Sequence, residues 1–326
     1  MNYKRTSSPS SAAVVAGNHD VLMEIFLNLS AKSLIRFQTL NKHRNSETAT
    51  PSFRHLHSLR HPHGTSGPQH AFLLRATTTS QLYTCHPTVK KLIPFRFRFP
   101  YVKILQSYNG LLLLECKNRP HGRKNYYVCN PTTMQSKNLF GSDEHRVRSF
   151  SGLFLAFDPS KSPHYKVICL TPTGPGRHEH EHRVAIYDSE THTWKQCGKS
   201  YINHGNLCNG IYWNNGIYFV RLKSSSFRFC PQDHVQRWLD KPPIPSAFAG
   251  KNGTDMISLL GMIRGDWEED SLLLLHVPGK IMVYRFCDEV FEVLVDFKGE
   301  YYFQEGDQLQ FGFKDAHQFV HTLTPV

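Results

Sequence analysis

The spacing of apolar residues changes near residue 70 of the 326-residue chain. Before this point apolar positions recur every three or four residues, which predicts amphipathic helices. The first predicted helix follows Asp20, a residue type that caps helices, and the second follows Ser30. Weaker helical spacing covers residues 41–48 and, after Pro51, one or two further turns. The periodic residues are Val21, Leu22, Ile25, Phe26 and Leu29 in the first helix, Leu34, Phe37 and Leu40 in the second, and Phe53, Leu56 and Leu59 beyond Pro51.

Short apolar segments with turn residues between them replace the helical pattern from residue 71 onward. The turns carry Asn-Gly, Asn-Pro, Asp-Pro and Pro-Gly pairs, because Asn and Gly tolerate positive φ and Pro cannot donate to a strand ladder. No long amphipathic pattern occurs in this part. Many short strands over about 250 residues predict an all-β sandwich, barrel or propeller. The predicted strands are 71–75, 102–105, 111–116, 126–129, 153–157, 166–170, 183–187, 211–213, 217–221, 271–277, 280–285 and 291–295.

A loose internal repeat favours the propeller among these β folds. Residues 127–133 and 185–194 both run from an apolar strand through Asn or Asp into a Thr-rich turn, and residues 157–159 form a partial third copy. Degenerate repeats suit propeller blades, each of which buries a face on its neighbour. The sequence therefore predicts an α+β multidomain protein, with a small N-terminal all-α unit followed by a large all-β, propeller-like domain. The predicted boundaries are 1–17 for a disordered tail, 18–60 for the helical unit, 61–70 for a linker and 71–326 for the β domain.

The helical unit carries more apolar surface than it can enclose. Of the 20 residues from Val21 to Leu40, 12 are apolar, and they lie on more than one helical face. A unit of about 40 residues buries surface poorly, and each exposed Leu, Ile or Phe forgoes roughly 1.5–3 kcal/mol. The segment therefore docks either on its own β domain or in the groove of a partner. The intervening Gly- and Pro-containing linker favours the partner.

Composition narrows the class of protein. The chain is 40% hydrophobic and 12% aromatic, which excludes a mostly disordered protein, and its formal net charge of +12 permits anionic partners without selecting one. The longest apolar runs, residues 111–114 and 272–275, are far shorter than a membrane span, and no secretory signal is recognisable. The eight cysteines include no Cys-x-x-Cys pair. We therefore expect free, mostly buried thiols in a reducing compartment, the nucleus and/or cytoplasm, without membrane contact.

Two unusual runs are candidates for other chemistry. His178, His180 and His182 alternate and would bind zinc or nickel on a strand, but they follow a Gly-Pro loop, so a solvated loop is the favoured interpretation. The same interpretation applies to the histidines at positions 55, 57, 61 and 63. Residues 95–99 alternate Phe and Arg. This run is either a stacking strip for single-stranded nucleic acid or, as we favour, a β-strand with Phe inward and Arg outward. We expect no metal and no cofactor, and nucleic acid is not the expected partner.

Catalytic motifs are missing from the sequence. It contains no Gly-x-Ser-x-Gly elbow, no P-loop and no His-Glu-x-x-His segment. The acidic residues 268–270 follow Trp267, and a surface turn is favoured there over a pair of catalytic carboxylates. A glycosidase-like propeller enzyme is therefore the weaker alternative. The four tryptophans are interpreted as blade anchors rather than ligand platforms.

Residues 20–37, which read Asp-Val-Leu-Met-Glu-Ile-Phe-Leu-Asn-Leu-Ser-Ala-Lys-Ser-Leu-Ile-Arg-Phe, resemble the F-box of plant F-box proteins. The resemblance continues through residues 40–43 and 51–53. Downstream segments resemble the F-box-associated β domain of the same family, and their order is more specific than any one of them. These segments are Ser107-Tyr-Asn-Gly-Leu-Leu, Val128-Cys-Asn-Pro-Thr-Thr, Ala156-Phe-Asp-Pro, Ala185-Ile-Tyr-Asp and Asn209-Gly-Ile-Tyr-Trp.

The resemblance implies a non-catalytic substrate receptor of an SCF-type cullin-RING ubiquitin ligase. The F-box would bind a Skp-family adaptor, and through it the cullin, while the β domain would hold an unknown target protein. The positions that match the adaptor-binding motif are Leu22, Ile25, Phe26, Leu29, Leu34 and Leu40. The alternative is a non-ligase propeller interaction protein with a degenerate F-box, whose helices pack internally.

The chain departs from the F-box pattern at several positions. Gly17-Asn18 stands where Leu-Pro is common, and Ser30 stands where Pro is common. Asn41 replaces the usual Cys, Arg44 the usual Trp, and Glu47-Thr48 an apolar pair. The first two helices therefore match the family and the third is degraded. The sequence leaves open whether these departures weaken or abolish adaptor binding.

Overall fold

The computed structural model describes three ten-residue helices near the N-terminus, a short helical stretch at residues 46–48, and a series of β-strands from residue 70 onward. The predicted tail (1–17) lies outside the described residues, as do residues 41–45, 62–69, 178–180 and 267–270. No described helix is long and apolar enough to cross a membrane. The described residues are 18–40, 46–61, 70–76, 81–85, 92–99, 101–119, 122–141, 150–174, 181–202, 210–213, 216–219, 226–230, 235–239, 258–263, 272–277, 280–285, 287–288, 290–296, 303–305, 308–310 and 313–326.

The first helix begins earlier than predicted. In α2 (His19–Asn28), the Asn18 side chain accepts a hydrogen bond from the Val21 amide at 3.2 Å. This bond satisfies one of the N–H groups that a first turn leaves without a partner. The predicted cap, Asp20, lies inside the first turn instead, where its negative charge favours the positive end of the helix dipole. The predicted helix is confirmed and the predicted cap is wrong.

The second and third helices begin at hydroxyl caps. Ser30 precedes α3 (Ala31–Leu40), as predicted, and its Oγ accepts a hydrogen bond from the Ser33 amide at 3.3 Å. Thr50 caps α5 (Pro51–Arg60) by accepting one from the Phe53 amide at 3.2 Å. Pro51 opens α5 because the first helical position needs no N–H donor. The segment after Pro51 is therefore a full helix of 10 residues rather than one or two turns.

Strands fill the rest of the described chain, and every pairing between them is antiparallel. They form five four-stranded sheets with the orders β22-β1-β2-β3, β4-β5-β6-β7, β8-β9-β10-β11, β12-β13-β14-β15 and β16-β17-β18-β19, and the two-stranded sheet β20-β21. The bounds are β1 His70–Ala76, β2 Leu82–Cys85, β3 Leu92–Phe95, β4 Tyr101–Tyr108, β5 Leu111–Lys117, β6 Lys124–Asn130, β7 Gln135–Asn138, β8 Gly152–Ala156, β9 Lys166–Pro172, β10 Glu181–Asp188, β11 Thr193–Tyr201, β12 Gly210–Trp213, β13 Gly216–Phe219, β14 Ser226–Cys230, β15 Val235–Leu239, β16 Ser258–Ile263, β17 Leu272–Val277, β18 Lys280–Arg285, β19 Phe291–Asp296, β20 Phe303–Glu305, β21 Gln308–Gln310 and β22 Phe313–Val320.

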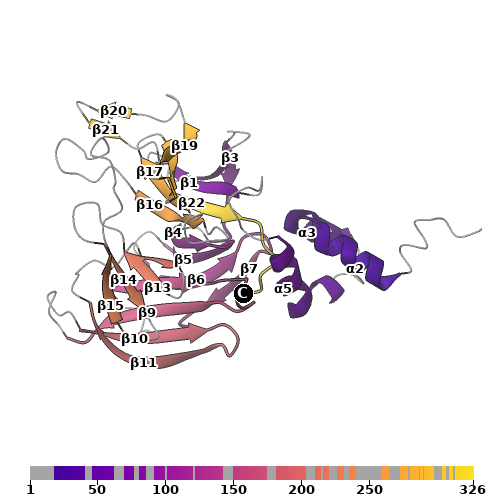
Figure 1. Ribbon diagram of the computed structural model, residues 1–326, viewed down its shortest axis with the longest axis horizontal. Helices are drawn as coiled ribbons and strands as arrows, with labels where there is room; N and C mark the ends of the chain where they lie inside the picture. The colour runs from indigo at the N-terminus through magenta and orange to yellow at the C-terminus, as the bar shows by residue number, and fades with distance from the viewer. Residues whose placement is uncertain are drawn as a thin grey trace, which may run out of the picture.

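The leading strands of the four-stranded sheets contact one another in sequence. β22 contacts β4, β4 contacts β8, β8 contacts β12, β12 contacts β16, and β16 contacts β22. The C-terminal strand β22 also pairs with β1, with His70 opposite Val320, so the two ends of the β region share one sheet. Gln106 of β4 accepts a hydrogen bond from the Leu155 amide at 2.6 Å and donates one to the Gly210 carbonyl, which ties three leading strands together. Figure 1 shows the helices beyond one end of these strands, beside the C-terminus.

The sheet β4–β7 buries both of its faces. Leu111 and Leu113 pack in a cluster with Leu155 of the next sheet, whereas Leu112 and Leu114 pack with Phe319 of the preceding one. Successive side chains of a strand point to opposite faces, so the run of four leucines fills two interfaces. A strand covered on both faces reads as a continuous apolar run rather than an alternation.

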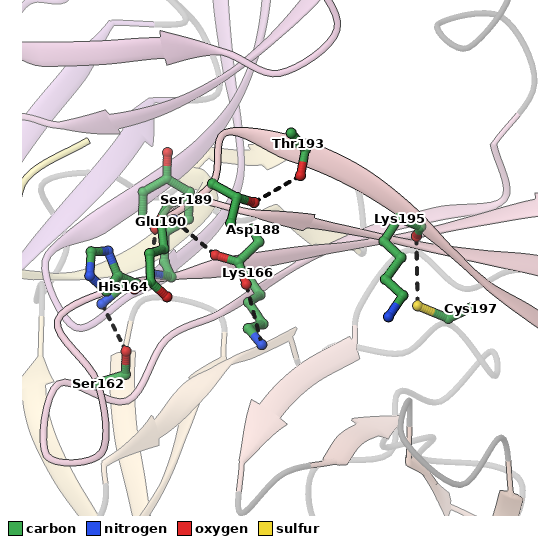
Figure 2. A network of polar contacts seen from close by, with 11 residues as sticks. Ser162, His164, Lys166, Asp188, Ser189, Glu190, Thr193, Lys195 and Cys197 are labelled. Carbon is green, nitrogen blue, oxygen red and sulfur yellow. Dashed lines mark hydrogen bonds and ion pairs between the residues drawn. The ribbon is translucent and has the colours of Figure 1, made fainter.

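The predicted internal repeat corresponds to a repeated turn. The side-chain oxygens of Asn130 and Asp188 each accept a hydrogen bond from the amide two residues later, at 2.9 Å in both cases. The residue four places later is left-handed in both turns, with φ 57° at Met134 and φ 56° at His192. Each turn joins the third and fourth strands of its sheet, β6–β7 and β10–β11. Figure 2 shows the second turn, with Lys166 beside the Asp188 carboxylate.

The segment that alternates Phe and Arg is only partly a strand. β3 ends at Phe95, and the chain bends at residues 98–99 before β4, so the strand predicted over 95–99 is wrong. The predicted alternation is correct. Phe97 and Phe99 pack against the core, while Arg96 and Arg98 are exposed.

Candidate functional site

A small hydrophobic core holds the helical unit together, and its last member comes from the other end of the chain. Leu323 is 2% exposed and packs with the helices, three residues after β22 ends. The Phe26 ring lies 5.0 Å from the Phe37 ring. The helices therefore dock on their own C-terminal segment. The buried members are Phe26 and Leu27 from α2, Ala31 and Leu34 from α3, Phe53 from α5, and Leu323.

Residues 321–326, called here the C-terminal bracket, are fixed to the β4–β7 sheet by hydrogen bonds. The Asn130 side-chain amide donates to the carbonyls of Thr322 at 3.0 Å and Thr324 at 2.8 Å, and all three residues are buried. The Thr322 and Thr324 hydroxyls lie 2.8 Å apart. Val326 packs against the core between the β4–β7 and β8–β11 sheets. The bracket is thus bonded to the β region on one side and contributes Leu323 to the helical core on the other.

Gly110 permits the close approach of the bracket to the β4–β5 turn. Its φ is +82°, in the left-handed region that favours glycine, and a Cβ atom there would lie 2.7 Å from the Val320 carbonyl oxygen and nearer still to the Thr322 side chain. Asn109, at φ 47°, donates to the Phe157 carbonyl at 3.0 Å. The predicted Asn-Gly turn is confirmed, and it also forms the seat of the bracket.

His57 of α5 and His61, the residue that follows this helix, close the end of α2. His57 Nε2 donates to the Leu29 carbonyl at 2.8 Å, and His61 Nε2 donates to the Leu27 carbonyl at 2.9 Å. Carbonyls at a helix C-terminus have no partner within the helix, so the histidines satisfy groups that would otherwise be unbonded. Burial lowers the pKa of His57 from 6.5 to about 4. The prediction of a solvated loop is therefore wrong for His55 and His57, which lie within α5. It is also wrong for His182, which is buried in β10. His63 lies outside the described residues.

An exposed ion pair adds a second link between the same two helices. Both guanidinium nitrogens of Arg60 contact the Glu24 carboxylate, with the Nη2–Oε2 distance at 2.9 Å. Hydrogen bonding to Arg60 lowers the pKa of Glu24. An exposed pair contributes little stability, so it orients α5 against α2 rather than holding it there.

The residues predicted to bind the adaptor fall into two groups. Phe26 is 3% exposed and Leu34 is 0% exposed, so both lie in the core of the helical unit. Ile25 is 42% exposed, and Leu22 and Leu29 are half-buried against the core. The Leu40 side chain lies outside the described residues. Adaptor binding by this set stays a prediction.

Three further apolar side chains that the predicted set omits are exposed. Val21 is 40% exposed on α2, and Leu56 and Leu59 are 50% and 44% exposed on α5. α2 and α5 pack against each other. Together with Ile25, these residues leave four apolar side chains on two packed helices facing solvent in the free chain. The periodicity of Phe53, Leu56 and Leu59 was the available signal for the α5 part.

Most of the described cysteines, and Trp194, behave as predicted. Cys85, Cys116, Cys129 and Cys169 are buried free thiols. Burial raises the pKa of Cys129 to about 11, which leaves that thiol protonated and unreactive. The Trp194 ring stacks on Phe140 at 5.1 Å and its Nε1 donates to the Leu139 carbonyl at 2.7 Å, so it anchors the β10–β11 hairpin. The other tryptophan side chains and the carboxylates at 268–270 lie outside the described residues.

Comparison with known proteins identifies the family. Residues 63–229 match the F-box associated beta propeller domain. The chain is 25% identical to F-box protein At5g07610 of Arabidopsis thaliana, over 98% of this chain and 94% of that protein. It is 24% identical to F-box protein At1g53790 of the same plant, over 63% of this chain and 48% of that protein. The chain therefore belongs to the family of plant F-box proteins that carry an F-box associated beta propeller domain, as the resemblance predicted.

Solved structures show only a distant likeness. TolB from Acinetobacter baumannii superposes with a TM-score of 0.41 and 10% identity, over 82% of this chain and 72% of that chain. A nidogen–laminin complex superposes with a TM-score of 0.37 and 7% identity, over 78% of this chain and 99% of that chain. These scores are too low to assign a fold by themselves.

Proposed function

We propose that this protein is the substrate receptor of an SCF-type cullin-RING ubiquitin ligase, acting in the nucleus and/or cytoplasm. The exposed apolar surface on α2 and α5 carries the proposal, together with the family membership. A Skp-family adaptor would cover these side chains, and full burial of each would contribute roughly 1.5–3 kcal/mol to binding. They are Val21, Ile25, Leu56 and Leu59. The β domain would hold the target protein.

The mechanism requires no catalytic side chain in this chain. A receptor that grips an adaptor at one end and a target at the other raises the effective concentration of target lysines near the charged ubiquitin carrier. That effect depends on a fixed geometry between the two ends. Leu323 in the helical core and Asn130 at the bracket supply such a fixed connection.

We further propose that the β domain is a closed propeller with five four-stranded blades. The cyclic contacts of β22, β4, β8, β12 and β16 support closure, as does the sharing of one sheet by β1 and β22. Sharing the first and last strands in one blade joins the two ends of the ring without an exposed edge. The hairpin β20–β21 is then an insertion before the closing strand.

Two of the departures from the F-box pattern support a functional F-box rather than a degenerate one. Asn18 and Ser30 stand where proline is common, and both cap the helices that follow them. A helix N-terminus is stabilised by such a cap by about 1 kcal/mol. These substitutions therefore preserve α2 and α3, whereas Asn41 and Arg44 lie outside the described residues.

The adaptor proposal is tested by co-expressing the full chain with a Skp-family adaptor and measuring co-purification. The variant Val21→Asp with Ile25→Asp places two charges on exposed apolar positions, so it folds but loses adaptor binding because each charge would be buried unpaired in the interface. The matched control is Met134→Asp, at an apolar position of the β domain that is 54% exposed. Loss of adaptor in the double variant and its retention in the control is the expected result.

Equal adaptor recovery from the wild-type chain and the double variant would reject the proposal. It would then favour the alternative, a non-ligase propeller interaction protein whose F-box is degenerate. The burial of Leu34 and Phe26 with Leu323 is the observation that favours this alternative, because it shows that part of the apolar excess is satisfied within the chain.

A further inference from the structure

One stretch of the chain concentrates positive charge. Residues 96–124 contain a single acidic residue, Glu115. Basic side chains occur throughout the same stretch, and we call them the cationic end: Arg96, Arg98, Lys103, Lys117, Arg119, Arg123 and Lys124. A local excess of this size creates a field that attracts anionic groups.

The strand register gathers these charges at one end of the β4–β7 sheet. Lys117, the last residue of β5, pairs with Tyr101 at the start of β4 and with Lys124 at the start of β6. Lys103 pairs with Glu115 two residue pairs further into the sheet. The remaining members lie in the segments that lead into β4 and join β5 to β6. Lys103, Lys117 and Lys124 are therefore held by paired strands, and the other charges lie in the two adjoining segments.

The cationic end lies at the end of the sheet away from the helices. The opposite ends of the same strands carry Gly110 and Asn130, which contact the bracket. β5 has 7 residues, and a strand rises about 3.3 Å per residue, so the two ends are about 20 Å apart. A ligand at the cationic end would leave the apolar surface of α2 and α5 free. This separation suits a receptor that must hold two proteins at once.

Most of this charge is not neutralised within the described part of the chain. Glu115 is engaged by Lys124 at 3.0 Å and by the Tyr126 hydroxyl at 3.3 Å. No ion pair among the described residues involves Lys103, Lys117 or Arg119, and none involves Arg96 or Arg98. All of these except the half-buried Lys117 are exposed. Tyr101 is 47% exposed beside them and offers one aromatic contact.

The aromatic residues of the same segment argue against nucleic acid as the ligand. Nonspecific single-strand binding uses exposed aromatic faces on which successive bases stack. Phe97 packs against Phe95 at 5.1 Å and Phe99 against Tyr127 at 4.7 Å, so these rings are occupied by the core. What remains at the surface is a set of guanidinium and ammonium groups, which form charge-assisted hydrogen bonds with carboxylates.

Building on the receptor role proposed above, we propose that the cationic end binds an extended, Asp- and Glu-rich segment of the target protein. Arg96, Arg98, Lys103 and Arg119 pair with its carboxylates, and Tyr101 packs against its backbone or an apolar side chain. Long-range attraction would speed the encounter, and pairing with Lys103, which β4 holds in place, would fix the register.

The test uses the full chain and a fluorescein-labelled peptide of alternating Glu and Gly, with a Gln-Gly peptide as the neutral comparison. Fluorescence anisotropy should show binding of the acidic peptide that weakens with added salt. The variant Lys103→Glu with Arg119→Glu should lower its affinity about tenfold, since two charge reversals each remove a favourable contact and add a repulsive one. The control Arg183→Glu with Lys195→Glu reverses one exposed arginine and one exposed lysine of another sheet, neither of which forms an ion pair among the described residues, and should retain the affinity.

Two results would overturn the inference. The first is equal affinity of the wild-type chain and the Lys103→Glu, Arg119→Glu variant for the acidic peptide. The second is tighter binding of single-stranded DNA than of the peptide, lost in the same variant, which would assign the surface to nucleic acid. Adaptor co-purification is measured on the same preparations. A wild-type chain that binds the adaptor but not the acidic peptide would reject this inference and leave the receptor proposal intact.

Discussion

The two ends of the β4–β7 sheet present opposite chemistry. At the end beside the helices, Asn130 donates to two buried bracket carbonyls, and Gly110 leaves room for the bracket to approach. At the far end, Lys103 and Arg119 face solvent. Buried polar groups must be hydrogen-bonded, whereas exposed charges keep their hydration at little cost. The first end is built for a permanent contact within the chain and the second for a reversible contact with another molecule.

The permanent contact at the first end also explains why the helical unit does not fold independently of the β region. Its core is completed by Leu323, which belongs to the bracket, so folding of the helices is coupled to the pairing of β22 with β1. A Gly- and Pro-containing linker between residues 61 and 70 favours independent units, yet the chain is joined a second time at its other end. The contacts of the bracket are therefore the place to break this coupling.

The largest effect is expected from Gly110→Ala. An alanine at this position would have to adopt the left-handed backbone that Gly110 has, which costs about 1–2 kcal/mol. Its Cβ would also collide with the Val320 carbonyl and Thr322, which adds about 1–3 kcal/mol. We expect the free energy of unfolding in urea to fall by about 2–5 kcal/mol.

Gly141→Ala is the matched control for this prediction. Its φ is +56°, and nothing lies within 4 Å of a Cβ placed there, so only the backbone term of about 1–2 kcal/mol applies. The same loss of stability in both variants would show that the close approach of the bracket contributes nothing.

A smaller and more local effect is expected from Leu323→Ala. The side chain is 2% exposed, and truncating a buried leucine costs about 2–4 kcal/mol. Because Leu323 completes the helical core, hydrogen exchange of the α3 amides should accelerate while the β5 amides keep their protection. Val293→Ala, at a position 43% exposed, is the control and should change the unfolding free energy by about 0.5 kcal/mol or less. Equal loss of protection in α3 and β5 would mean that the bracket stabilises the β region rather than the helices.

The sequence predicts the inner strands better than the outer ones. β5 was recognisable as a run of leucines because both of its faces are buried. β7 (Gln-Ser-Lys-Asn) and β11 were missed because they are polar, and an outer strand has few core contacts to impose an apolar pattern. β22 was missed for another reason. It reads Phe-Lys-Asp-Ala-His-Gln-Phe-Val and is recognisable as a strand only when paired with β1, far away in the sequence.

The same distinction holds for the candidate sites. Ile25 was predicted from local helical spacing, and it is exposed on α2. The role of Leu323 could not be predicted, because its neighbours in the sequence have no periodicity and its contacts are made with helices almost 300 residues earlier. The cationic end was visible in the sequence only as the Phe-Arg alternation. Its remaining members are brought together by the strand register.

The smallest expected change in unfolding free energy comes from removing one hydroxyl of a buried pair, compared with one of an exposed pair. The Thr322 and Thr324 hydroxyls lie 2.8 Å apart in the buried bracket, and the Thr191 and Thr193 hydroxyls lie 2.8 Å apart in an exposed turn. Thr324→Val keeps the side-chain shape but leaves the Thr322 hydroxyl without this partner, which should lower the unfolding free energy by about 1–2 kcal/mol.

Thr193→Val makes the same chemical change where water can replace the lost partner, so its effect should stay within about 0.5 kcal/mol. Thermal unfolding of the two variants side by side measures the difference. A larger effect at Thr193 than at Thr324 would contradict the assignment of the bracket as a dry, permanent contact. Attachment of the bracket would then rest on its other contacts, chiefly Leu323 and the bonds that Asn130 makes with the Thr322 and Thr324 carbonyls.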